Sequence, residues 1–380
     1  MIGIKFQKLG TLLLASMLLI AGCGSPGSES ADSASEFNED STGPITFTFF
    51  GADASPNWNH MQDDVGKEIT AQTGVTLHAE YDVGSGGGQS KIALMAASGQ
   101  FPDLIYAKGE LGKLVDAGAF IDLTELIDKY APNIKKIMGK NTNRMKYSKD
   151  DPAIYAIPTN IGVDGYGISI TTACQDPVRA IKFMDWLSSE EGQVLRNWGI
   201  EGKHYNVEDG KRVIPADVLD KKVNDAANFS KQTGIELYAV FGVRYGDGVK
   251  DSTGNYYTTR FPEQIIASYS DAEKETLAAY QATTWKDLFP SEKDFPVKEW
   301  GALYNMQVPT DGNYQIIYQK TQDIVRKRIP EAILVKPADF DKVYDAFIDE
   351  LNKAGAEKME KEYSELVKAR VSLFTGKDVQ

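Results

Sequence analysis

The sequence of 380 residues contains very little cysteine and histidine. Its two cysteines, Cys23 and Cys174, exclude a disulfide framework. The three histidines, His60, His78 and His204, do not have the spacing of metal ligands. The patterns G-x-S-x-G and H-E-x-x-H, which place a nucleophilic serine or a catalytic zinc, are absent. We therefore expect no metal, no cofactor and no catalytic residues.

Positive charge is also scarce. The chain has 41 basic and 54 acidic residues, a formal net charge of −13, which argues against nucleic acid as a ligand. The hydrophobic content of 42% is enough for folded cores, and the length suggests roughly two or three domains. With so many acids, neighbouring carboxylates alone do not identify a glycosidase, which needs two at a defined separation. A surface glycosidase remains the less favoured alternative.

Residues 1–22 have the features of a secretory signal peptide. Lys5 and Lys8 precede an apolar stretch, Leu9 to Ile20, that is short for a membrane span. The run Leu19 to Cys23 resembles the lipobox of bacterial lipoproteins. That resemblance implies cleavage before Cys23 and attachment of a diacylglycerol and further acyl chains, such as palmitate, to this residue. An ordinary signal peptide with an incidental cysteine is the alternative.

Residues 23–44 have the composition of a disordered tether. The stretch from Gly24 to Pro44 is rich in Ser, Gly, Ala and acidic residues, contains no Lys or Arg, and has one aromatic residue, Phe37. No later stretch is apolar enough to span a bilayer. We therefore expect a folded body anchored by lipid to the extracytoplasmic face of the cell membrane, with Cys174 as a small packing residue.

Residues 45–164 alternate between strand and helix patterns and predict an α/β lobe. The strands are expected at Ile45–Phe50, Val75–Tyr81 and Asp103–Ala107, where β-branched and aromatic residues are concentrated. Asp122, with Glu125 three residues later, predicts a capped helix that Pro132 ends. Ligands of such sheets bind in the loops at the carboxyl ends of the strands.

Three segments resemble the extracellular solute-binding lipoproteins of carbohydrate ABC importers, and more narrowly their LplA-like branch in sporulating Gram-positive bacteria. The segments are Ala96 to Lys136, Gly167 to Tyr205 and Ile333 to Arg370. Ser98-Gly99, Pro102-Asp103, the Gly118–Leu126 stretch and Pro132-Asn133 carry the first. The resemblance implies a periplasmic-binding-protein-like two-lobe fold of the α/β class.

The sequence departs from this family after Asp164, where a long internal segment is missing. Residues 165–310 would form a shortened, helix-rich second lobe, with only two clear strands, Ile168–Thr171 and Leu237–Val243. Helices are expected near Val218–Phe229 and Ala272–Tyr280. Residues 311–380 predict C-terminal helices that pack across the lobes. The chain is either a naturally shortened member or the product of an internal deletion.

The candidate ligand-binding residues follow from the loop rule and from the chemistry of sugars. Aromatic rings stack on the apolar faces of sugars, and polar side chains bond the hydroxyl rim. Trp58 could serve the ligand or pack at a helix start, and Tyr106 could be core. The expected ligand-binding residues are Trp58, Asn59, Tyr106, Lys108, Trp198, Trp300 and Tyr304.

The sequence thus predicts a lipid-anchored, monomeric protein that captures a carbohydrate without chemistry. The resemblance implies that this carbohydrate is an oligosaccharide. The resemblance implies membrane permease subunits of an ABC importer as partners. A surface lipoprotein without a transport role, or a deletion relic serving as an interaction module, is the alternative.

Overall fold

The computed structural model describes residues 42–84, 88–160, 167–291, 294, 301–303, 306, 308 and 313–378. All of them belong to one unit, Phe37–Gln380. The expected signal peptide, Cys23, most of the tether, the junction after Asp164, Trp300 and Tyr304 lie outside the described residues.

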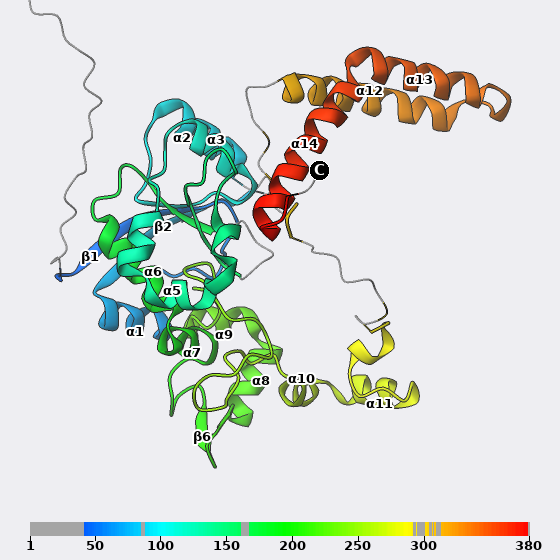
Figure 1. Ribbon diagram of the computed structural model, residues 1–380. Coiled ribbons are helices and arrows are strands. Elements are labelled where there is room, and N and C mark those ends of the chain that lie inside the picture. The colour runs from blue at the N-terminus through cyan, green and yellow to red at the C-terminus, as the bar shows by residue number, and fades with distance from the viewer. Residues whose placement is uncertain are drawn as a thin grey trace, which may run out of the picture. The chain divides into compact units, whose positions relative to one another are not determined.

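A five-stranded mixed sheet forms the centre of the α/β part of the chain (Figure 1). The strands are β1 (Ile45–Gly51), β2 (Val75–Tyr81), β3 (Leu104–Tyr106), β4 (Ile157–Pro158) and β5 (Gly167–Ile170), in the order β2-β1-β3-β5-β4. The first three strands run parallel, as the sequence predicts. Because β5 is antiparallel to both β3 and β4, β4 points in the same direction as β1, β2 and β3.

Alternation along the strands buries both faces of this sheet. On one face, Phe47 and Phe49 join a core with α1 (Asp64–Thr73) and α6 (Pro177–Ser188). On the other face, Phe50 packs with residues of α2 (Gln89–Ser98) and α3 (Leu111–Asp116). The remaining helices up to Trp198 are α4 (Thr124–Tyr130), α5 (Pro132–Met138), α7 (Glu190–Trp198) and the 3-10 turns η1 (Lys108–Glu110) and η2 (Gly139–Met145).

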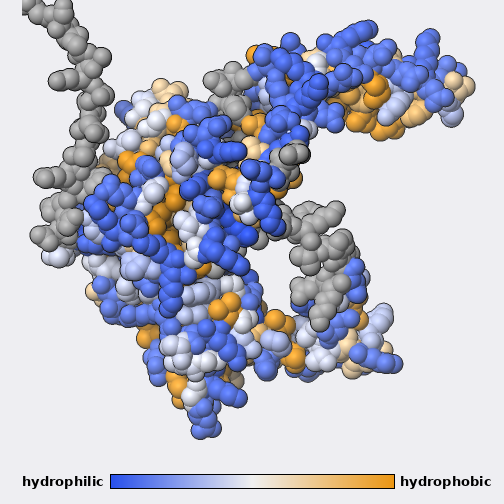
Figure 2. All heavy atoms as spheres, in the orientation of Figure 1, coloured by the Kyte–Doolittle hydropathy of each residue, from blue (hydrophilic) through white to orange (hydrophobic). Residues whose placement is uncertain are grey.

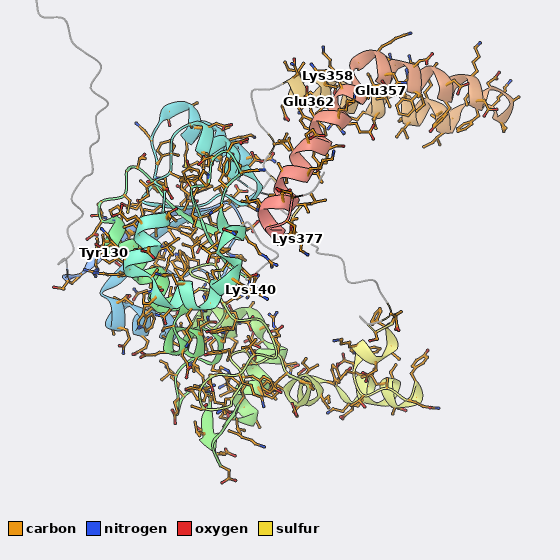
Figure 3. The ribbon with its side chains drawn as sticks, in the orientation of Figure 1. Tyr130, Lys140, Glu357, Lys358, Glu362 and Lys377 are labelled. Carbon is orange, nitrogen blue, oxygen red and sulfur yellow. The ribbon has the colours of Figure 1, made fainter. Side chains whose placement is uncertain are left out.

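Two carboxylates hold this core together, and both lie in the segments whose sequences resemble solute-binding lipoproteins. Asp103 accepts hydrogen bonds from the backbone N–H and hydroxyl of Thr48, at 2.8 and 2.6 Å, and from the backbone of Gln175 at 2.9 Å. Asp185 on α6 accepts from the backbone of Ile134 and the amide of Asn133, both at 2.8 Å, and so caps α5. These motif residues therefore position strands and helices. Tyr130 on α4, labelled in Figure 3, makes a cation–π contact with Lys182 on α6.

The helix caps agree only partly with the sequence expectations. Asp176 caps α6 by accepting from Arg179 N, and Pro177 opens the helix, as predicted. Asp122 does not form the expected capping box with Glu125, because α4 begins at Thr124. Its carboxylate accepts instead from Thr124 and from the backbone of Ile154.

Both strands expected in a second lobe are corrected by the structure. Ile168–Thr171 forms a strand, but this strand is β5 and pairs with β3 and β4 in the first sheet. The stretch Leu237–Val243 has no strand and consists of turns. It stays irregular because side chains satisfy its backbone: Arg196 donates to Phe241 O at 2.8 Å and to Val243 O at 3.2 Å.

After β5, the described residues contain one further sheet, the hairpin β6 (Asn206–Glu208) and β7 (Lys211–Val213). The other elements are helical: α8 (Ala216–Asn224), α9 (Ala226–Thr233), α10 (Pro262–Ser268), α11 (Asp271–Ala279) and the 3-10 turn η3 (Trp285–Leu288). The single helix expected at Val218–Phe229 is divided at Asp225, and the helix expected at Ala272–Tyr280 is α11.

Three helices complete the chain: α12 (Asn313–Leu334), α13 (Phe340–Ala354) and α14 (Ala356–Thr375), with the turn η5 (Pro337–Asp339). Arg328 on α12 binds Glu350 on α13 at 2.6 Å, and Lys358 and Glu362 pair along α14 (Figure 3). Apolar side chains also remain exposed on the α12–α13 pair (Figure 2), among them Ile333 and Leu334. In the part of the chain described here, no helix has the length and apolar character of a membrane span.

Candidate functional site

The carboxyl ends of four strands lie at one level of the sheet. Gly51 pairs with Tyr81 and Tyr106, and Ile168 of β5 pairs with both Tyr106 and Ile157. The residues that follow these strands therefore emerge along one edge. We call residues 52–59, 82–84, 107–110 and 159–160 the carboxyl edge. In open α/β sheets, ligands bind in this position.

An ion pair joins two loops of the carboxyl edge. Lys108, which follows β3, contacts Asp53 Oδ1, which follows β1, at 2.6 Å. Both side chains are about half exposed, at 42% and 47%. An exposed pair of this kind contributes little to stability. Lys108 has a φ of +52°, in the left-handed region that a residue with a side chain rarely adopts. Strain at such a residue in a ligand loop is typical of functional sites.

A second set of contacts connects the start of α2 to the carboxyl edge. Gln89 donates from its amide to Glu110 Oε1 at 3.0 Å, and Asp82 accepts from the backbone of Gly88 at 3.0 Å. A side chain at Gly88 would meet Ala52 at 3.0 Å, and its φ is +70°. Only glycine fits this close approach without strain.

The end of β4 is bound by a residue from much later in the chain. Arg244 N donates to Thr159 O at 3.1 Å, and Arg244 Nε donates to Asn160 Oδ1 at 2.6 Å. The two residues also form a parallel bridge. The carboxyl edge thus carries the carboxylate of Asp53, the amide of Asn160 and the ammonium of Lys108, and Arg244 binds to it from a later part of the chain.

Trp58 packs between two tyrosines at one end of the carboxyl edge. Its ring centroid lies 5.5 Å from that of Tyr81 and 5.6 Å from that of Tyr238. Its indole N–H is buried and has no hydrogen-bond partner among the residues that the structure describes. Asn59 donates its amide to Lys231 O at 2.7 Å. These contacts agree with the packing role that the sequence left open for Trp58. Its contact with a ligand stays a prediction.

Tyr106 and Trp198 lie in packed surroundings. Tyr106 belongs to the main core, where 9% of it is exposed. Trp198 donates its indole N–H to Tyr256 O at 2.9 Å and packs against Tyr205 and Phe261. The structure therefore brings together Trp58, Asn59, Tyr106 and Lys108 at the carboxyl ends of the strands, and places Trp198 at the end of α7.

Sequence reasoning missed Asp53, Asn160 and Arg244. Asp53 lies in the loop after the first predicted strand, so the loop rule could have found it. Asn160 directly follows β4, a strand of only two residues that gives no periodic signal. Arg244 directly follows Leu237–Val243, the segment wrongly predicted as a strand, and no local pattern reveals its contact with the carboxyl edge.

Buried polar groups fasten the start of α1 to later segments. Tyr238 donates its hydroxyl to Asp63 Oδ2 at 2.8 Å, and Asp63 Oδ1 accepts from Gly66 N at 2.6 Å. Burial raises the pKa of Asp63, although these two hydrogen bonds oppose the increase. Next to it, Asp64 lies 3.2 Å from His204 Nε2. Burial lowers the pKa of His204 despite the nearby carboxylate.

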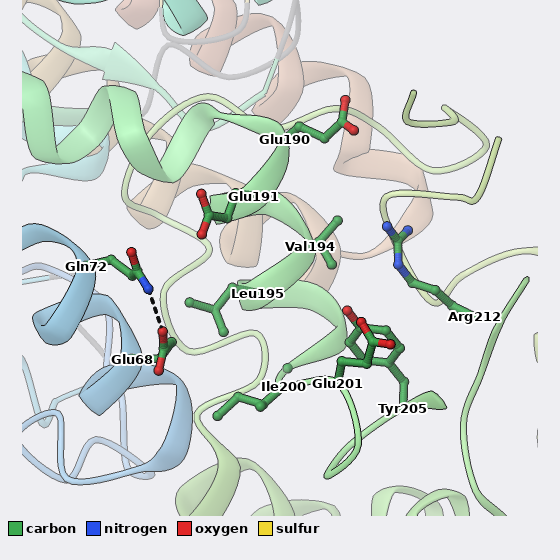
Figure 4. Close-up of a pocket in the computed structure, with 11 residues that line it drawn as sticks. Glu68, Gln72, Glu190, Glu191, Val194, Leu195, Ile200, Glu201, Tyr205 and Arg212 are labelled. Carbon is green, nitrogen blue, oxygen red and sulfur yellow. Dashed lines mark hydrogen bonds between the residues drawn. The ribbon is translucent and has the colours of Figure 1, made fainter. Parts of the chain in front are cut away.

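A separate cavity of about 480 Å³ lies beside α1 and α7 (Figure 4). Its walls carry several carboxylates, and Gln72 donates to Glu68 across one turn of α1 at 2.8 Å. Gln72 lies in the last turn of α1, which leads to the amino end of β2, so this cavity is separate from the carboxyl edge. Within the described ranges, no group of three acidic, histidine or cysteine side chains could hold a metal ion.

Residues 64–164 match a family model described as bacterial extracellular solute-binding protein. A fructooligosaccharide ABC transporter substrate-binding protein, FusA of Streptococcus pneumoniae serotype 4 (strain ATCC BAA-334 / TIGR4), is 30% identical over 164 residues. The match covers 40% of this chain and 30% of FusA, so the chain spans less than a third of that relative's length.

Solved structures of binding proteins share the fold. An extracellular solute-binding protein from Bifidobacterium longum subsp. infantis has a TM-score of 0.56 and 10% identity, covering 86% of this chain and 98% of that one. FusA in complex with fructo-nystose, as an EF-hand mutant, has a TM-score of 0.55 and 12% identity, covering 88% and 100%. The alginate-binding protein AlgQ2 has a TM-score of 0.53 and 16% identity, covering 87% and 98%. The resemblance to solute-binding proteins and the two-lobe α/β fold class are confirmed.

Proposed function

We propose that this chain is an extracytoplasmic substrate-binding protein that captures a carbohydrate, specifically an oligosaccharide, for an ABC importer, and that its carboxyl edge contacts the sugar. One observation carries the proposal. Asp53, Lys108 and Asn160 follow three strands that finish at one level, and Arg244, from a fourth part of the sequence, binds Asn160. The fold is the one used by the oligosaccharide-binding proteins named above.

The side chains at the carboxyl edge suit a ligand with many hydroxyl groups. A carboxylate accepts hydrogen bonds, ammonium and guanidinium groups donate them, and an amide does both. A sugar hydroxyl both donates and accepts, so it can bind next to any of them. When a sugar lacks one of these hydroxyls, the protein group that should bind it is left unpaired, which costs about 1–3 kcal/mol of binding free energy. This cost makes the site selective among sugars.

The mechanism we propose is capture and delivery without a chemical step. Closure of two lobes around a ligand is the usual device of such folds, and it presents both lobes to a permease. We further propose anchoring through acyl chains on Cys23, a monomeric state, and membrane permease subunits as partners. Catalysis has no part in this proposal, because the named relatives are binding proteins.

The alternative is a surface lipoprotein that serves as an interaction module without transport. It is favoured by one observation: after β5, the described residues form only the small β6–β7 hairpin and helices. A two-stranded sheet is marginal alone, so the second wall of a sugar cleft is reduced.

Thermal unfolding of the full chain in mild detergent, with a panel of neutral and acidic oligosaccharides, separates the two functions. A ligand at 100 times its dissociation constant adds about 2.7 kcal/mol, which raises the unfolding temperature by a few degrees. A rise with one sugar class supports capture for import. A cooperative transition that no sugar moves supports the interaction module.

A further inference from the structure

The guanidinium of Arg244 has one hydrogen-bond partner in the described ranges. The guanidinium uses its Nε to bind Asn160 Oδ1 at 2.6 Å. Its two terminal nitrogens make no hydrogen bond or ion pair with any residue in the described ranges. Those two nitrogens form the fork that matches a carboxylate in a bidentate manner.

The backbone around Arg244 is held on both sides, and the contact of Nε with Asn160 orients the guanidinium. Arg244 N binds Thr159 O at 3.1 Å. On either side, Arg196 and Gln193 of α7 bind Val243 O at 3.2 and 3.1 Å, and Gln193 Oε1 accepts from Tyr245 N at 3.2 Å. A cation positioned in this way is suited to recognition, because little side-chain freedom is lost when a ligand binds.

A second cation next to Arg244 increases the positive potential. Arg196 is 1% exposed and binds only backbone carbonyls, those of Phe241 and Val243. Burial, and then the charge of Arg244, lower the pKa of Arg196. No carboxylate in the described part of the chain pairs with either arginine. A buried charge without a counter-ion is unfavourable, and a bound anion would offset it.

The strand register places Arg244 so that one chain of sugars could reach it and Lys108 together. Lys108 follows β3 and Asn160 follows β4, and these strands flank β5. Neighbouring strands are about 4.8 Å apart, so the two ends are separated by roughly 10 Å. An oligosaccharide spans such a distance with separate sugar units.

We propose that the ligand is an acidic oligosaccharide, and that Arg244 binds the carboxylate of a uronate unit through its two terminal nitrogens. This proposal rests on the proposed function, since it names the substrate class of the same site. A neutral sugar would satisfy the nitrogens with hydroxyls but would leave the charge of the two arginines unbalanced.

Calorimetric titration of the full chain in mild detergent tests this proposal. The probes are trimers of galacturonate, mannuronate and guluronate, each also as its methyl ester, which removes the charge but keeps the hydroxyls. Maltotriose and a neutral fructose trisaccharide serve as uncharged sugars, and acetate serves as a carboxylate without a sugar. We expect one acid trimer to bind about 10- to 100-fold more tightly than its ester, the factor for a charged hydrogen-bonded pair.

Three variants assign the effect. Arg244→Gln should reduce the affinity for the acid to that for the ester, and Arg244→Lys, which keeps the charge without the fork, should fall between them. Arg260→Gln is the control, because Arg260 is exposed and pairs with Glu236. The unfolding temperature of each variant shows whether it is folded.

Each of the other outcomes contradicts one part of the proposal. If esters or neutral trimers bind as tightly as acids, the acidic class is wrong and the proposed function stands. If the acid binds but Arg244→Gln changes nothing, the assignment to Arg244 is wrong. Competition by acetate at equal concentration would indicate a general anion site. If neither acidic nor neutral sugars bind, the inference and the proposed function fail together.

Discussion

The hydroxyl of Tyr238 donates to the buried carboxylate of Asp63 at 2.8 Å, joining residues 175 positions apart in the sequence. Asp63 also caps α1, the helix that follows the loop of Trp58 and Asn59. This one hydrogen bond therefore fixes the irregular segment that leads to Arg244 against the loop that follows β1. The space is tight, since a side chain at Gly234 would overlap the Asp63 carboxylate.

Replacing Tyr238 by phenylalanine should destabilise the protein markedly. The variant keeps the ring packing but leaves the Asp63 carboxylate with one donor fewer. A hydrogen bond to a charged group is worth about 1.5–3 kcal/mol, so a loss of that size is expected in urea unfolding. Tyr280→Phe is the control, because Tyr280 is 69% exposed. A Tyr238→Phe effect as small as that of the control would show that the hydrogen bond contributes nothing.

The raised pKa of Asp63 predicts a distinct pH dependence. Its pKa is higher in the folded state than the unfolded value of 3.8, so between these two values the folded state binds more protons. The contribution of Asp63 to stability therefore falls as the pH rises through that window. Asp63→Asn still caps α1 but does not titrate. The stability of the wild type relative to Asp63→Asn should decrease from low to neutral pH in urea unfolding; an increase would contradict the assignment.

His204 should act in the opposite direction. Its Nδ1 accepts from Ile200 N at 2.9 Å, so the neutral ring carries its proton on Nε2, facing Asp64. Protonation would place a second donor against the Ile200 N–H. Because the folded pKa is below the unfolded value of 6.5, His204 supports stability above pH 6.5 and loses this support as the pH falls towards the folded pKa.

Measuring unfolding between pH 5 and 8 checks this assignment, with His204→Gln compared with the wild type. Below pH 6.5, the stability of His204→Gln should fall less steeply with decreasing pH than that of the wild type. His78→Gln, at an exposed position of β2, should keep the wild-type profile. Identical profiles for both variants would contradict a role of His204.

Lys108 should show a trade-off between stability and binding. Its left-handed backbone costs about 1 kcal/mol, which glycine does not incur. Lys108→Gly should therefore leave stability unchanged or slightly higher while sugar affinity falls. Gln281→Gly, at a φ of +56°, is the control that should change stability in a similar way without affecting binding. A Lys108→Gly protein that binds as the wild type does would remove Lys108 from the site.

Local patterns predicted most of the first sheet and its helices. The β-branched and aromatic runs at Ile45–Phe50 and Val75–Tyr81, and the Asp176-Pro177 start of α6, appear in the structure where the sequence places them. The β-propensity of each run and the cap of α6 are written within the segment itself, so the sequence around each element is enough to predict it, although the strands pair with distant partners.

Partners distant in sequence decide the rest. Ile168–Thr171 has a strand pattern, but nothing in the pattern says that it pairs with β3. Leu237–Val243 also has a strand pattern, and the buried donors of Arg196 make turns the better arrangement. The same distance hides the contact of Arg244 with Asn160, so half of the candidate site could not be found from the sequence alone.

The placement of the sugar at the carboxyl edge is tested most directly by calorimetric titration. The ligand is a sugar that raises the unfolding temperature, and the proteins are the wild type and two matched double variants. Asp53→Ala with Lys108→Ala removes the pair at the carboxyl edge. Asp128→Ala with Lys135→Ala removes an exposed pair of the same 2.6 Å length on α4 and α5. Our account predicts about 10-fold or greater loss of affinity for the first variant and none for the second. Equal affinity in all three proteins would contradict the placement of the sugar at the carboxyl edge.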